Sequence, residues 1–341
     1  MDSLARVIAL TDHFRFPPSA RDRRNGYKEW HHFCIIAPDV QAILNLNLGY
    51  DAQSPAGQEV ARVVLLVHDH AWDGDVETIP ARDVQVHRGL IDARLGHNSI
   101  RFQDGVFDLS VALSDRPITL ALRLTPVSFP LLRSSTPIDE GTISWLVVPR
   151  LLASGHITVG RRVYALDQAP AYHDHNWGHW LWGQDFAWQW GFALPESADV
   201  PWSMVFDRVT DRARNRALEL RLAFWKGAQI QRLFMHDEIQ TWPQGHFDAP
   251  GRVPKFPRVM ALVAPEVTTD VPACLEVIAR RGDDHLHCHF QAEDIVQVVV
   301  PNESDLGTTV INEVSGSLEA SGRVKGEPVA MRGRGFFEFL T

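Results

Sequence analysis

Residues 171–192, AYHDHNWGHWLWGQDFAWQWGF, combine groups that can transfer protons with large aromatic rings. The stretch holds five of the chain's eleven tryptophans, three histidines, two aspartates and an asparagine. Burying several titratable groups side by side costs about 1–3 kcal/mol for each one left imperfectly paired. A segment that only filled a core would therefore use apolar residues. The composition favours an acid/base site lined by aromatic rings over the alternative, a packed core with a satisfied hydrogen-bond network.

If this stretch is a β-strand, its two faces carry different chemistry, because side chains alternate along a strand. One face would carry Tyr172, Asp174 and Asn176, and the other His173, His175 and Trp177. Gly178 would then allow a sharp bend. Beyond it, aromatic residues continue in even register as far as Phe192. The pattern predicts a continuous aromatic wall that leads away from a polar cluster.

Composition limits the classes of partner. The chain has 341 residues, 45% of them hydrophobic and 22% charged, which is typical of a folded protein with two middling domains. The net charge of −9 argues against nucleic acid or an anionic membrane surface as the default partner, since both require clustered Lys and Arg. Cys34, Cys274 and Cys288 include no CxxC pair, which indicates a reducing cytoplasm and no disulfide framework. We see no signal-peptide stretch and no run near the ~20 apolar residues of a membrane span.

Most of the chain is organised as short segments of alternating or apolar residues. The clearest are 65–70, 104–114, 118–126, 141–149, 156–166 and 275–291. Turn-forming residues separate these segments, and long helical periodicity is scarce. Twenty-three glycines and twenty-one prolines suit an antiparallel all-β protein with many turns.

The two halves of the chain contain a similar pattern. ASGHITVGRRVYALDQAPAYHD at 153–174 and ASGRVKGEPVAMRGRGFFE at 320–338 both begin Ala-Ser-Gly and end with an aromatic residue two before a carboxylate. Chance similarity of two hairpins is one explanation. The other is two related β-barrels in tandem, each of a size that can hold one small ligand. This interpretation divides the chain into an N-terminal extension (1–25), a first barrel (26–168) and a second barrel (169–341), with residues 171–192 at the junction.

The segment Tyr-His-Asp-His-Asn-Trp-Gly at 172–178 resembles the signature of the carotenoid 1,2-hydratase (hydroxyneurosporene synthase) and AttH-like family. Residues 26–33, 147–166 and 312–339 are similar to three further family blocks. The resemblance implies two tandem lipocalin-like antiparallel β-barrels with the site at or near their interface. It also implies apolar substrates, often isoprenoid or polyketide, and chemistry on carbon–carbon double bonds.

The resemblance points to Asp174 as the proton donor. A carboxylic acid in an apolar pocket can stay protonated near neutral pH because burial disfavours its charged form. His173 and His175 are then expected to orient this acid or return its proton, and Tyr172 to bind the carboxyl or the incoming water. The expected substrate-binding residues are Asn176 and the tryptophans Trp30, Trp145, Trp177, Trp188 and Trp190. Indole faces would stabilise a developing carbocation by about 0.5–2 kcal/mol each.

Other histidine clusters fit simpler interpretations. His285, His287 and His289 alternate with apolar residues and most simply point to solvent, and the same holds for 68–70. His173 and His175 could bind zinc with a remote third ligand, but we favour a site with no metal and no cofactor. Whether His31 and His32 belong to the site stays open. No nucleotide-binding or GxSxG motif is present in the sequence.

The sequence therefore predicts a cofactor-independent hydratase that protonates a C=C bond of a lipophilic, isoprenoid-like substrate. A cyclase or pericyclase acting on a polyene, and a non-catalytic carrier of apolar ligands, are the alternatives. The expected partner is a hydrophobic small molecule, with peripheral membrane contact for its uptake and a cytoplasmic location.

Overall fold

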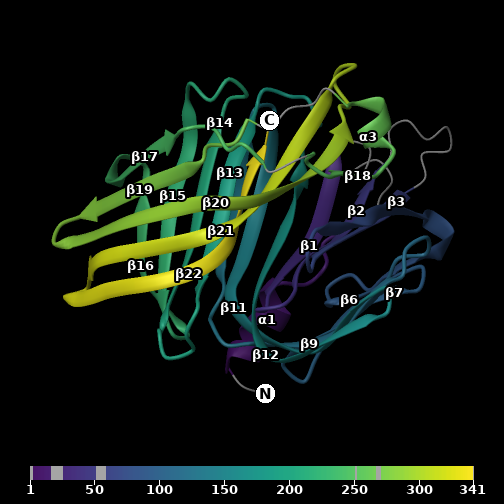
Figure 1. The fold of residues 1–341 in the computed structure, drawn as a ribbon, viewed down its shortest axis with the longest axis horizontal. Helices are drawn as coiled ribbons and strands as arrows, with labels where there is room; N and C mark the ends of the chain where they lie inside the picture. The colour runs from purple at the N-terminus through teal and green to yellow at the C-terminus, as the bar shows by residue number, and fades with distance from the viewer. Residues whose placement is uncertain (1–2, 17–25, 51–58, 250–251, 266–269, 341) are drawn as a thin grey trace. The chain divides into compact units, whose positions relative to one another are not determined.

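The computed structural model describes residues 3–16, 26–50, 59–249, 252–265 and 270–340, which are almost entirely β-structure (Figure 1). The predicted all-β class is confirmed. The chain divides into two compact units, residues 1–181 and residues 182–341. None of the described helices has the length and apolar character needed to cross a membrane.

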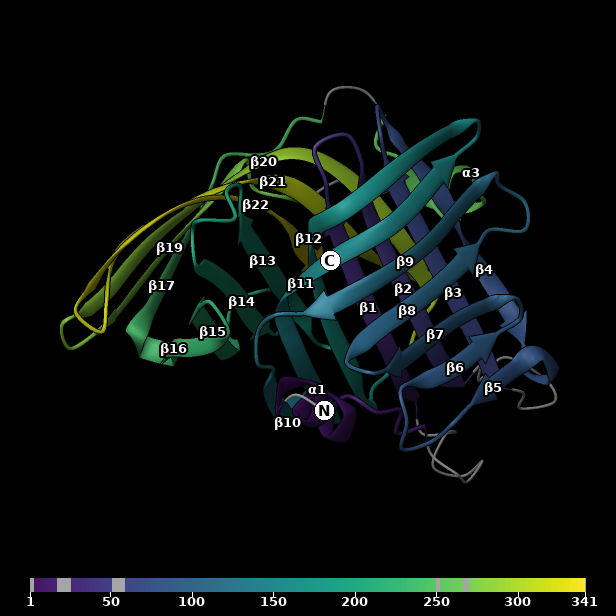
Figure 2. The same ribbon diagram turned by 90° about the horizontal axis from the view of Figure 1, so that it is seen from below.

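The first unit is a 12-stranded antiparallel sheet preceded by one helix, α1 (Ser3–Thr11). Its strands are β1 (Tyr27–Ile36), β2 (Gln41–Tyr50), β3 (Glu59–His68), β4 (Trp72–Pro80), β5 (Val84–Val86), β6 (Asp92–Leu95), β7 (Asn98–Gln103), β8 (Val106–Ala112), β9 (Ile118–Pro126), β10 (Leu131–Ile138), β11 (Gly141–Val159) and β12 (Arg162–His179). The strand order is β4-β3-β2-β1-β12-β11-β9-β8-β7-β6-β5, and β10 pairs with β11. A short 3-10 turn, η1 (Ala81–Asp83), joins the two end strands, so the sheet forms a nearly closed barrel (Figure 2).

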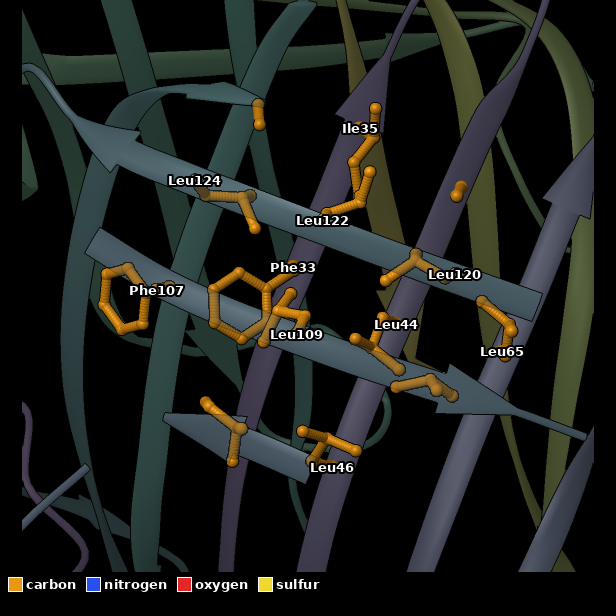
Figure 3. Close-up of a cluster of buried hydrophobic side chains, with 14 of the residues drawn as sticks. Phe33, Ile35, Leu44, Leu46, Leu65, Phe107, Leu109, Leu120, Leu122 and Leu124 are labelled. Atoms are coloured by element: carbon orange, nitrogen blue, oxygen red, sulfur yellow. The ribbon is translucent and has the colours of Figure 1, made fainter. Parts of the chain in front are cut away.

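Apolar side chains from the inner faces of these strands fill the first barrel. Leucine and phenylalanine residues of β1, β2, β8 and β9 meet there, as Figure 3 shows for Phe33, Leu44, Leu109 and Leu122. This packing follows from sequence, since strands such as β9 alternate buried and partly exposed residues.

The N-terminal segment belongs to this unit and contains a helix that the sequence analysis did not predict. Leu4 and Ile8, four residues apart on one face of α1, join the barrel core together with Phe14. The predicted extension 1–25 is therefore packed structure over residues 3–16. Residues 17–25 lie outside the described part of the chain.

The second unit is a 10-stranded sheet with its own apolar core. Its strands are β13 (Ala187–Pro195), β14 (Trp202–Thr210), β15 (Ala217–Lys226), β16 (Gln229–Met235), β17 (Ile239–Gln244), β18 (Lys255–Phe256), β19 (Cys274–Arg281), β20 (Asp284–Pro301), β21 (Thr308–Val324) and β22 (Glu327–Leu340). Their order is β16-β15-β14-β13-β22-β21-β20-β19-β17, and β18 pairs in parallel with β20. The short helices η2 (His236–Glu238) and α3 (Met260–Val263) lie between strands in the sequence.

The division between the units falls after Leu181 rather than after residue 168. The sequence DQAPA at 167–171 looks like an interruption but lies within β12. A register shift there, with Gln168 at a φ of 53°, accommodates the irregular residues without ending the strand. All of 172–178 therefore belongs to the first unit.

The repeated Ala-Ser-Gly segments occupy matching places in the two sheets. One lies in the hairpin β11–β12 and the other in the hairpin β21–β22. Gly155 (φ 133°) and Gly322 (φ 148°) both have a conformation that favours glycine, and a Cβ on either would lie 2.1–2.2 Å from a carbonyl oxygen of the neighbouring strand. The shared glycine thus has the same steric cause in both hairpins, which supports related units over chance similarity.

Candidate active site

The motif 172–178 lies on β12, between β1 and β11. Antiparallel pairing sets His32 and Val147 beside Asp174, and Trp30 and Trp145 beside Asn176. Because side chains at paired positions lie on the same face, these residues form one polar and aromatic surface, which we call the Asp174 face. Its members are Trp30, His32, Cys34, Trp145, Val147, Tyr172, Asp174 and Asn176.

The Asp174 face buries its acid. The Asp174 side chain is only 3% exposed, and the Asn176 Nδ2 donates a hydrogen bond of 2.5 Å to its Oδ1. Tyr172 is fully buried on the same face. The ring of Trp30 meets the ring of Trp180 edge to face, with 5.4 Å between centroids. The face therefore offers a buried carboxyl group beside indole rings.

His32 is neutral at physiological pH. Burial first, and then the nearby His173, lower the pKa of His32 to about 3. Its Nε2 lies 2.9 Å from the Cys34 Sγ. The residue paired with Asp174 on β1 thus adds no positive charge to this face. The sequence left the place of His32 open, and the register puts it next to the proposed acid.

His173 and His175 point to the opposite face, into the first barrel, where they contact Asp12. The His173 Nε2 lies 2.8 Å from Asp12 Oδ2, and the His175 Nδ1 lies 3.0 Å from Asp12 Oδ1. All three side chains are fully buried. Their contacts are thus with Asp12 and its neighbours rather than with the Asp174 carboxyl, and a role for either histidine in orienting or reprotonating Asp174 stays a prediction.

Trp177 lies on the inner face as well. The Arg15 guanidinium sits 3.6 Å from the centroid of one Trp177 ring, and the His175 ring lies 4.8 Å away. This cation–π contact already covers the indole. Trp177 therefore lies on the side of the sheet opposite Asp174, as the strand alternation predicted, and its role in substrate binding stays a prediction.

A second carboxylate, that of Glu29, holds the buried group formed by Asp12, His173 and His175, which we call the inner cluster. The Glu29 Oε1 lies 2.9 Å from the His175 Nε2 and accepts a hydrogen bond from the Arg15 backbone N–H. The Tyr27 hydroxyl donates to the other oxygen of Glu29 at 2.8 Å. Both ring nitrogens of His175 therefore face carboxylates.

Charge is unevenly divided within this cluster. Burial alone would raise the pKa of Asp12, but His173, His31 and His175 outweigh it and hold that pKa far below its usual range. Burial would also lower the pKa of His175, but hydrogen bonds to Asp12 and Glu29 outweigh it and raise that pKa. For His31, burial and the neighbouring His175 lower the pKa well below its ordinary value. These surroundings therefore favour the ionised form of Asp12, the protonated form of His175 and the neutral form of His31.

Asp12, His31 and His175 form a group that could hold a metal ion, with one donor atom from each lying within 4.8 Å of the others. Asp12 was not predicted as a site residue, because it lies more than 160 residues from His173 and His175 in the chain. Glu29 was also missed as a functional residue. The only sequence signal for it was its place in the segment 26–33, which resembles a family block.

The predicted aromatic wall is shorter than expected. β12 ends at His179 and β13 begins at Ala187, so a turn interrupts the even register. Within the second unit, Trp188 and Trp190 share one face of β13. The Trp188 Nε1 donates a hydrogen bond to Glu338, and burial raises the pKa of that carboxyl to about 7.

The remaining histidine clusters have surface partners. His285 and His287 are exposed, and His287 and His289 both contact Glu276. Asp69 binds Arg162 at 2.6 Å. The interpretation that the 285–289 histidines point to solvent is confirmed, although His289 keeps only partial exposure.

Several solved structures share this fold. A candidate AttH protein of Nitrosomonas europaea is 14% identical, covers 96% of each chain and superposes with a TM-score of 0.66. Kievitone hydratase from Nectria haematococca is 14% identical over 94% of this chain and 90% of its own, with a TM-score of 0.56. CghA, solved with Sch210972, is 12% identical over 93% and 88%, with a TM-score of 0.63.

No protein-family model matches the chain, and no curated protein matches its sequence. At 12–14% identity, the structural likeness establishes a shared fold. The shared fold extends over nearly the whole chain, with a nearly closed antiparallel barrel in the first unit and a second large sheet in the second.

Proposed function

We propose that this protein is an acid/base enzyme that adds water to a C=C bond of a lipophilic, isoprenoid-like substrate. Asp174 is the acid. The observation that carries the proposal is the Asp174 face, where a buried carboxyl shares one side of the sheet with Trp30 and Trp145, which flank Asn176 two residues farther along β12. The fold shared with a protein named as a hydratase supports the same reaction class.

Burial suits Asp174 to hold a proton. Removing a carboxyl from water disfavours its ionised form, and the neutral His32 beside it supplies no charge to favour that form. Asn176 holds one carboxyl oxygen through its amide. We assign proton transfer to this carboxyl group, with Tyr172 on the same face as the residue that binds water.

The reaction needs one proton and returns it. The Asp174 proton goes to one alkene carbon, whose π electron pair forms the new C–H bond and leaves positive charge on the other carbon. Trp30 and Trp145 would stabilise that charge by about 0.5–2 kcal/mol each. Water adds to the cationic carbon, and its surplus proton goes back to the Asp174 carboxylate.

Replacing Asp174 by asparagine tests the assignment. Asp174→Asn keeps the shape of the side chain but removes the transferable proton, so we expect turnover of an acyclic isoprenoid polyene to fall by about 10²–10⁴-fold. Asp167→Asn, the same change at an exposed position of β12, is the matched control and should leave turnover unchanged. Turnover that survives in Asp174→Asn, with a native circular dichroism spectrum, would refute Asp174 as the acid.

Product analysis in ¹⁸O-labelled water separates hydration from its alternatives. Label in the product supports the hydratase. An unlabelled, isomeric product indicates that a second double bond captured the cation or that the polyene reacted by a pericyclic route. Saturable quenching of tryptophan fluorescence with no product at any protein concentration indicates a carrier of apolar ligands.

A further inference from the structure

We infer that Asp12, His31 and His175 form a binding site for one divalent transition-metal ion inside the first barrel. The three residues come from separate parts of the chain: the segment after α1, β1 and β12. All three side chains are fully buried. The site lies on the inner face of β12, opposite the Asp174 face, and does not depend on the proposed function.

The distances between donor atoms are close to those of a metal site. Asp12 Oδ1 lies 3.0 Å from His175 Nδ1 and 3.9 Å from His31 Nδ1. Zinc bonds of about 2.0–2.1 Å in a tetrahedral arrangement separate neighbouring ligand atoms by about 3.3–3.4 Å. All three donor atoms lie within 4.8 Å of one another, so side-chain rotations that shorten the longer distances would bring them around one ion.

The surroundings orient two of the ligands. Glu29 accepts at the His175 Nε2, which directs the Nδ1 of the same ring toward Asp12. His173 holds the second oxygen of Asp12, and the His173 Nδ1 lies 2.8 Å from the backbone oxygen of His32. Carboxylates and carbonyl groups that fix the far nitrogen of a histidine are the usual outer partners of metal ligands.

His31 is buried beside the inner cluster, but the ion pairs among Asp12, His173, His175 and Glu29 do not account for its ring nitrogens. Neither of its ring nitrogens has a hydrogen-bond partner in the described part of the chain, although the residue is fully buried. Leaving such a group unpaired costs about 1–3 kcal/mol. An ion bound at His31 removes this cost, whereas the contacts of Asp12 with His173 and His175 do not.

Two imidazoles and one carboxylate favour a transition metal such as Zn²⁺ over Mg²⁺ or Ca²⁺, which prefer oxygen ligands. Binding at the His175 Nδ1 displaces the proton shared with Asp12, and that proton goes to solvent. Because the ligands are fully buried and lie far apart in the sequence, the ion's role is structural: it fixes the segment after α1 to β1 and β12.

Metal binding by the full chain tests this inference. After treatment with a chelator, the protein should bind one equivalent of Zn²⁺ by calorimetry, and Co²⁺ should give visible absorption bands of an N/O-ligated ion. Zn²⁺ should also raise Tm. His31→Phe removes one ligand while keeping the ring contacts with Phe14 (4.4 Å) and His175 (3.9 Å), so this variant should fold without metal. Its Zn²⁺ affinity should fall by more than ~100-fold, and Zn²⁺ should no longer raise its Tm.

The surface histidines supply the control. His287→Ala with His289→Ala removes the exposed His287 and the partly exposed His289 beside Glu276, where metal could bind adventitiously. This double variant should keep the one-equivalent site and the Co²⁺ spectrum. The inference is overturned if the unaltered protein takes up no ion, or if His31→Phe binds Zn²⁺ as tightly as the unaltered protein does.

Discussion

Asp174 and His175 are neighbours in the sequence, but their side chains lie on opposite faces of β12. The alternation of β12 turns Asp174 toward His32 and Asn176 and turns His175 toward Asp12 and Glu29. One heptapeptide therefore supplies the proposed acid on one face and part of a buried charge cluster on the other. Two histidines of the motif, His173 and His175, thus contact Asp12 in the inner cluster rather than the Asp174 carboxyl.

His32 gives a test of electrostatics at the scale of one residue. Its pKa of about 3 in the folded chain lies below the ordinary value of 6.5. The native state favours the neutral form of His32. The contribution of His32 to the free energy of unfolding is therefore fully present above pH 6.5 and is lost as the pH falls from 6.5 toward 3. Each pH unit in that range contributes up to ~1.4 kcal/mol.

Replacing His32 by glutamine removes this titration. We expect the free energy of unfolding of His32→Gln, measured by denaturant titration, to depend less steeply on pH between 6.5 and 4 than that of the unaltered protein. His285→Gln, the same substitution at an exposed residue, should keep the original slope. Equal slopes for all three proteins would show that His32 does not titrate in this way.

At the same scale, sequence predicted the faces of the motif but not its partners. The alternation of Tyr172 to Trp177 follows from strand geometry alone, which is why it could be assigned in advance. Asp12 could not be assigned, because its contact with His173 depends on where the segment after α1 enters the barrel. The helix α1 was also missed, since only Leu4, Ala5 and Ile8 of its residues are buried.

At the scale of elements, Gly178 shows how a strand constrains its motif. The sequence suggested a bend at this glycine, but β12 continues through His179. A Cβ on Gly178 would lie 2.0 Å from the Thr142 carbonyl oxygen of β11. Close approach of the two backbones, rather than a turn, explains the glycine that ends the motif.

Gly178→Ala should therefore push β11 and β12 apart and destabilise the protein by about 1–3 kcal/mol, as overpacking usually does. The measurement is a thermal unfolding curve compared with that of Gly49→Ala. Gly49 lies in β2, where an added Cβ has only an ordinary contact at 3.7 Å, so its Tm should change little. A Tm for Gly178→Ala that equals the control would mean that the strand pair adapts without cost.

At the scale of the whole molecule, the chain consists of two sheets with separate cores. No described strand of the 12-stranded sheet is hydrogen-bonded to the 10-stranded sheet. The sequence predicted two units because Gly155 and Gly322 mark matching hairpins. The sequence placed the boundary at 168 because the irregular residues DQAPA at 167–171 resemble a linker in composition, although they lie inside the long strand β12.

The position of the boundary decides whether the first unit can fold by itself. A fragment of residues 1–181 keeps every strand of the 12-stranded sheet, whereas a fragment of residues 1–168 lacks the half of β12 that pairs with β1. Loss of that half would open the barrel and expose the edge of β1 along nine paired positions, Tyr27–Ile35. We expect 1–181 to give a β-type circular dichroism spectrum, dispersed amide resonances and a cooperative unfolding transition, and 1–168 to give none of these. If 1–181 fails to fold, its core needs more of the chain than its own sheet. If 1–168 folds equally well, the second half of β12 is dispensable, and the boundary predicted from sequence would describe the folding unit better than the division of the native structure does.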